Sequence, residues 1–195
     1  MKKRIVLIFF IFLFVLAGKG QSFDPEITKG KLTIESDIFP GYKSFLDFNH
    51  EAVQKGWWRF SRKFGKPVNM RKYYETTIVN DHEENVHEVV LISKSLKYGR
   101  GTVFYLTLKN TGLSSELEKK YLKQVQTLLF EFKQEFYLSF YEDEMKDLER
   151  QAAQATKSLD KSRGNPQMEK QSFQELEKVN AALDEVKDKV RKLQQ

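Results

Sequence analysis

The sequence predicts an α+β protein: a small three-stranded antiparallel meander packed with helices, followed by a helical hairpin. Three short runs rich in β-branched and aromatic residues follow one another between residues 73 and 108. Residues 113–195 show helical periodicity, interrupted only by Gly164 and Pro166. The first pattern is typical of neighbouring strands, and the second of two long helices joined by a tight corner.

Residues 1–20 have the pattern of a secretory signal peptide. Basic residues at positions 2–4 precede an apolar run at 5–16, and small residues follow. This run of about 12 residues is shorter than the roughly 20 that a membrane-spanning helix needs. We therefore expect cleavage of the segment, an exported protein in the periplasm or outside the cell, and no membrane span after cleavage.

Loss of this leader changes the charge of the protein. The full chain carries 33 basic and 27 acidic residues, a formal net charge of +6. Four basic residues and no acidic residue lie in the leader, so the mature chain is nearly neutral. Proteins that bind nucleic acids need a basic excess in the folded domain, so we expect no nucleic-acid partner. The chain has no cysteine, which excludes disulfides and thiolate metal sites.

Residues 21–112 are predicted to form the small α+β domain. Its first part, 23–47, reads as an irregular arm because prolines and glycines punctuate it, with one candidate strand at 31–35. A helix follows, with Asn49 as the N-cap and Gly65 as the stop signal. The apolar residues of this helix recur at helical spacing: Val53, Trp57, Phe60 and Phe64.

The three predicted strands come next and would form the meander. They span 73–79, 86–96 and 102–108, with turns at 81–85 and 99–101. The helix before them and part of the helix after them would cover one face of this sheet.

Residues 113–195 are predicted to form a long helix and a C-terminal helix that pair as a coiled-coil-like hairpin. A helix over 113–163 would be about 70 Å long, whereas a compact domain of about 90 residues is about 30 Å across. Half of this helix must therefore project. The last helix carries a stripe at heptad spacing, which we interpret as a contact surface for a protein partner or a second copy: Leu176, Val179, Leu183, Val186, Val190 and Leu193.

A basic segment with two tryptophans is the one candidate ligand site. Trp58 falls away from the apolar face of its helix and lies among Lys55, Arg59 and Arg62. An exposed aromatic ring among cations could hold a phosphate- or carboxylate-bearing component of the cell envelope. The structural alternative is that the cations offset the helix dipole and that another part of the chain covers Trp58.

No catalytic, metal or cofactor site is predicted. The two histidines at 82 and 87 lie in an acidic turn, and their spacing does not match the spacing of histidines on a zinc protease helix. The 99–101 segment lacks the third glycine of a phosphate-binding loop.

The sequence therefore favours an exported, non-catalytic binding or structural module of the cell envelope, acting through protein–protein contacts of its hairpin. Two alternatives remain: a module that grips an anionic envelope component at the Trp58 face, and a holdase-like envelope chaperone.

Overall fold

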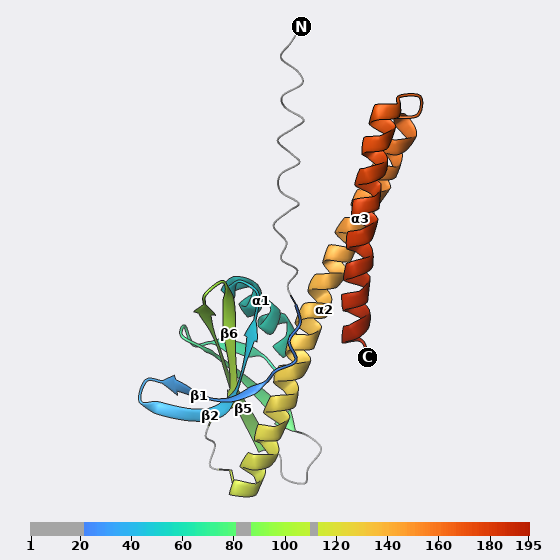
Figure 1. Ribbon diagram of the computed structural model, residues 1–195. Helices are drawn as coiled ribbons and strands as arrows, with labels where there is room; N and C mark the ends of the chain where they lie inside the picture. The colour runs from blue at the N-terminus through green and yellow to red at the C-terminus, as the bar shows by residue number, and fades with distance from the viewer. Residues whose placement is uncertain (1–21, 81–86, 110–112) are drawn as a thin grey trace.

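The computed structural model describes residues 22–80, 87–109 and 113–195 and has the expected α+β architecture (Figure 1). A six-stranded antiparallel sheet packs with helices, and the two longest helices lie side by side. The predicted leader at 1–20 and the predicted turn at 81–85 fall outside the described residues.

The elements follow one another in a simple order. Along the chain they are β1 (Thr28–Ile34), β2 (Asp37–Leu46), α1 (His50–Ser61), β3 (Pro67–Asn69), β4 (Tyr74–Asn80), β5 (His87–Tyr98), β6 (Gly101–Leu108), α2 (Ser115–Lys161) and α3 (Pro166–Leu193). The strands lie in the sheet in the order β1-β2-β6-β5-β4-β3, and every neighbouring pair is antiparallel.

The expectation of a three-stranded sheet is wrong, because the sheet has six strands. The three predicted strands are present as β4, β5 and β6, and they do run as a meander. The hairpin β1-β2 extends the sheet beyond β6, and the short β3 extends it beyond β4. The segment 23–47, expected as an irregular arm, thus supplies two strands.

Local backbone geometry explains why the β1-β2 hairpin was missed. Its turn contains Glu35 at φ 57°, a left-handed conformation that turn sequences usually assign to glycine or asparagine. Gly41 lies within β2, where a Cβ atom would overlap the backbone and side chain of β6. Pro40 lies in the part of β2 that pairs with β1 alone, where a missing donor is tolerated. Residues that usually interrupt a strand therefore occur inside this one.

Helix α1 forms as the sequence predicts. The Asn49 side chain accepts a hydrogen bond from the backbone N–H of Ala52 at 2.8 Å. Val53, Trp57 and Phe60 are buried against the sheet and α2. Gly56 is also buried, and a Cβ atom there would overlap the ring of Phe136 on α2. The glycine that weakens the isolated helix is thus required by the close approach of the two helices.

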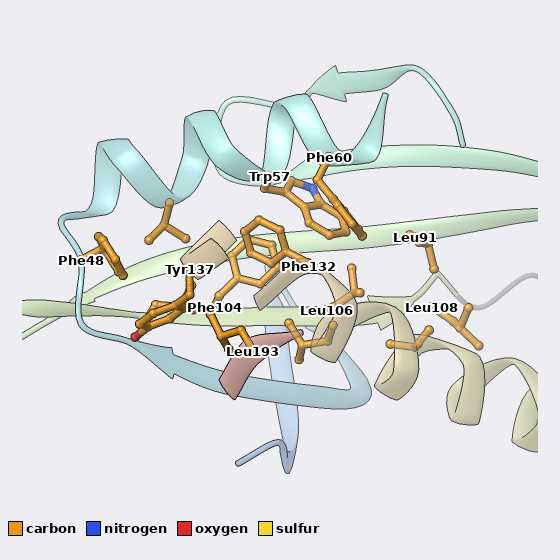
Figure 2. Packing of buried hydrophobic residues seen from close by; sticks show 14 of the residues in the cluster. Phe48, Trp57, Phe60, Leu91, Phe104, Leu106, Leu108, Phe132, Tyr137 and Leu193 are labelled. Carbon is orange, nitrogen blue, oxygen red and sulfur yellow. The ribbon is translucent and has the colours of Figure 1, made fainter. Parts of the chain in front are cut away.

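The main core lies between the sheet and the helices (Figure 2). Phe132 of α2 packs against Trp57 and Phe104, with ring centroids 5.1 Å and 5.0 Å away. A smaller cluster, which includes Leu32, Ile34 and Ile92, holds the β1-β2 hairpin on the opposite face of the sheet. Both faces of the central strands are therefore at least partly covered.

Helix α2 contains 47 residues and packs on the sheet with one half and on α3 with the other. Its N-cap is Ser114, and the Ser114 hydroxyl accepts a hydrogen bond from Leu117 N–H. The first half of α2 lies on the sheet, whereas the second half extends beyond it with α3 (Figure 1). The expected projection is confirmed.

Helices α2 and α3 pair antiparallel around a corner at Gly164, which has φ +91°. Asn165 caps α3 and Pro166 begins it. At the other end of α3, the Gln134 side chain donates to the carbonyl of Leu193 at 2.5 Å. Among the described residues, no helix is long and apolar enough to cross a membrane.

We predict that Gly56→Ala destabilises the protein. Alanine favours an exposed helix by about 1 kcal/mol, but here its methyl group must displace Phe136, and such overpacking costs about 1–3 kcal/mol. Urea denaturation should show a lower free energy of unfolding. Because Phe136→Leu removes part of the obstructing ring, Gly56→Ala should cost less in that background. A rise in stability for Gly56→Ala alone would contradict this account.

Candidate functional site

The predicted Trp58 face is a shallow cleft on the outer side of α1. The cleft has a volume of about 530 Å³ and is lined by Glu51, Gln54, Lys55, Trp58, Arg59 and Tyr74. Trp58 is 39% exposed, so no other segment covers it fully. Three of the four residues predicted for this site, Lys55, Trp58 and Arg59, therefore lie together.

Tyr74 of β4 forms the opposite wall of the cleft. Its ring meets the Trp58 ring edge to face, with centroids 5.8 Å apart and planes at 66°. This contact holds the indole in place, while part of the Trp58 side chain stays accessible. Sequence reasoning missed Tyr74, because its position opposite α1 depends on the pairing of β4 within the sheet.

Arg62, the fourth predicted residue, is exposed at the C-cap of α1 and does not line the cleft. Its neighbour Lys63 pairs with Glu135 of α2 at 2.5 Å and lies 5.4 Å from the Phe60 ring centroid. The end of the basic segment thus contacts the body of the protein, and Glu51 adds a negative charge to the cleft. The cleft can offer both hydrogen-bond donors and acceptors beside an aromatic wall.

A buried lysine, which the sequence analysis overlooked, joins α2 to β2 and the start of the described chain. The Lys133 side chain is fully buried, with 0% relative exposure. Its Nζ donates to Ser44 Oγ at 2.8 Å and to the carbonyl of Glu26 at 3.4 Å. The same Nζ lies 5.7 Å from the Phe23 ring centroid. Burial lowers the pKa of Lys133, and the nearby carboxylates of Asp24 and Glu26 oppose this change.

Two tyrosines on α2 surround the same region. The Tyr137 hydroxyl accepts a hydrogen bond from Asp47 N–H at 3.1 Å, and its ring packs against Phe23. Burial raises the pKa of Tyr137, and burial also raises the pKa of Tyr141 to about 12. Phe23, Tyr137 and Lys133 therefore hold residues 23–26 against α2.

A lysine of lowered pKa beside a serine has the composition of a nucleophilic dyad. Ser44, however, donates its own hydrogen to the carbonyl of Glu26 at 2.9 Å, and its side chain is buried with that of Lys133. We interpret the pair as a structural clamp. The sequence does contain a signal for the burial of Lys133. This residue lies four positions after Leu129 and four before Tyr137, so the three share one face of α2, and Leu129 and Tyr137 are buried.

The apolar stripe of α3 faces α2. Leu183, Val186 and Leu193 are buried, whereas Leu176, Val179 and Val190 are half-buried. The stripe therefore forms the seam of the hairpin. Nearer the corner, Met168 and Phe173 are 53% and 50% exposed. Apolar surface that the hairpin leaves accessible thus lies at its outer end.

Among the residues that the structure describes, no cluster of three or more histidine, aspartate or glutamate side chains could hold a metal ion. His82 lies outside the described part of the chain.

We predict a pH-dependent difference between wild type and Lys133→Met. The pKa of Lys133 in the folded protein is lowered from 10.5, the ordinary value for lysine. At pH values between the lowered pKa and 10.5, the unfolded chain therefore binds a proton at this lysine that the folded chain does not bind. Wild type should therefore gain stability relative to the variant as pH rises through this interval. Urea denaturation at several pH values measures the difference.

Lys157→Met is the matched control, because it removes a lysine at an exposed position of the same helix. A pH-independent difference for Lys133→Met would contradict the proposed burial of its charge.

No protein family matches the sequence, and no curated protein does. The function must therefore be inferred from the residues and their geometry.

Proposed function

We propose that this protein is an exported, non-catalytic module of the cell envelope that contacts a protein partner through its α2-α3 hairpin. The leader pattern supports export, and the periplasm or the extracellular space is the proposed location. The half-exposed pair Met168 and Phe173, near the corner of a hairpin that extends beyond the sheet, is the observation that carries the proposal.

Burial along the seam supports this choice. Near the sheet, the body covers the hairpin, and Val186 and Leu193 belong to the main core. Farther from the sheet, α2 and α3 pack against each other, and Leu176 and Val179 remain half-buried. Helix pairs with so little core usually gain stability from a further partner. A projecting pair can reach that partner without hindrance from the sheet.

Site-specific photo-crosslinking tests the proposal. A photoreactive residue in place of Phe173 should give a discrete adduct in envelope extracts or with a second copy. The same residue at Gln171, which is exposed on the other side of α3, should not. Equal labelling at both positions would contradict the proposal, as would a monomer that gives no adduct over a wide range of concentration.

The Trp58 cleft supports a second candidate function, the binding of an anionic envelope component. The half-exposed indole, held at one edge by Tyr74 and flanked by Lys55 and Arg59, is the observation that favours it. The indole offers a flat surface for stacking, and the cations can form charge-assisted hydrogen bonds with carboxylate or phosphate.

Tetragalacturonate, a carboxylate-bearing oligosaccharide, is a defined probe for this cleft. We expect Trp58→Ala and Arg59→Ala each to weaken binding about tenfold, and added salt to weaken the binding of wild type. Isothermal titration calorimetry measures the affinities. Arg62→Ala is the matched control, because Arg62 does not line the cleft. Equal effects of Arg59→Ala and Arg62→Ala would assign the binding to general charge and remove this candidate.

A further inference from the structure

A second cavity, far from the hairpin corner, lies between the first half of α2 and the sheet. Its volume is about 620 Å³, within the range of small-molecule sites. The sheet contributes the apolar side chains of Ile78, Val89, Leu91 and Leu108. Figure 2 shows Leu91 and Leu108 at the end of the core opposite Phe48 and Tyr137. The cavity thus continues the core toward solvent.

Several side chains around this cavity are incompletely covered. Phe64, Ile78 and Leu128 line it and are only half-buried, although each packs on the main core. The nearby side chains of Val89 and Leu91 are buried. An apolar ligand in this cavity would cover the accessible parts of Phe64, Ile78 and Leu128. It would also contact the buried side chains of Val89 and Leu91.

The wall that α2 provides is amphipathic. Tyr121, Val125 and Leu128 give it an apolar stripe. A second stripe beside it is polar, and its members recur at spacings of four, three and four: Lys120, Gln124, Thr127 and Glu131. The α2 wall of the cavity is therefore apolar along one side and polar along the other.

Charge is distributed unevenly along this wall. Lys123 lies toward one end and Glu131 lies at the other. The distance along the helix from Lys123 to Glu131 is about 12 Å at 1.5 Å per residue. An anionic group is therefore attracted to the lysine end of the cavity and repelled from the glutamate end. An uncharged chain attached to that group can extend along the cavity toward Glu131.

We propose that this cavity binds an amphiphile with a single alkyl chain and an anionic head, the head beside Lys123 and the chain on the apolar side chains of the sheet. The chemistry is shared by free fatty acids and by anionic lipids. The site is separate from the hairpin corner and from the Trp58 cleft, so the proposal does not depend on either function above.

Titration calorimetry with dodecanoate, below its micelle concentration, tests this proposal. We expect saturable binding with one ligand per chain. Octanoate should bind at least tenfold more weakly, because four fewer methylene groups leave water. Vesicles of phosphatidylglycerol form a parallel arm: binding to dodecanoate alone indicates a free acyl anion, and binding to vesicles as well indicates a lipid. Saturable binding in neither arm would overturn the proposal.

Two pairs of variants locate the site. Gln124→Trp places a large side chain at the cavity and should lower the affinity for dodecanoate at least tenfold, whereas Gln126→Trp, at an exposed position that does not line the cavity, should not. Lys123→Glu should lower the affinity for dodecanoate several-fold but leave the affinity for uncharged dodecyl maltoside unchanged. Lys119→Glu, exposed and outside the cavity lining, is its charge control. Equal effects within either pair would overturn the assignment.

Discussion

The packing of the middle of α2 on the sheet is the contact on which the rest of the structure depends. The Phe132 ring contacts both Trp57 of α1 and Phe104 of β6, and these two rings also contact each other, so the three side chains bring three elements together. Gly56 lets α1 approach α2 closely enough for this contact. Because cores are densely packed, the position of α2 in this cluster also determines where the hairpin leaves the body and how wide the cavity beside its first turns is.

Polar contacts next to this cluster fix the chain around α2. Lys133 follows Phe132 directly, and its buried ammonium group binds Ser44 and the carbonyl of Glu26. Tyr137, one turn later, accepts a hydrogen bond from Asp47 N–H. Burying a cation is costly unless its donors are satisfied, so these contacts favour one arrangement of β2 and of residues 23–26 over others. Burial of apolar surface is the dominant favourable term in folding, and we infer that the polar contacts add specificity to it.

The proposed binding surfaces lie where the packing around α2 ends. Toward the corner of the hairpin, the sheet no longer covers the helices, and Phe173 is exposed. Toward the start of α2, the helix spans apolar side chains of the sheet that it does not fully cover. On the outer side of α1, Trp58 packs against Tyr74 and stays partly exposed. Each surface combines a rigid support with apolar area that remains accessible, a common property of binding sites.

The sequence by itself determined the helices, the cap at Asn49, and the meander of β4, β5 and β6, because helical periodicity, capping and turn chemistry act over a few residues. Only the tertiary structure decided that the segment before α1 forms two strands, since Glu35 makes its turn without the usual glycine. It also decided that Lys133 is buried and that Trp58 borders an open cleft. The physical reason is the same for each: sheet pairing and burial depend on partners that are distant in the chain.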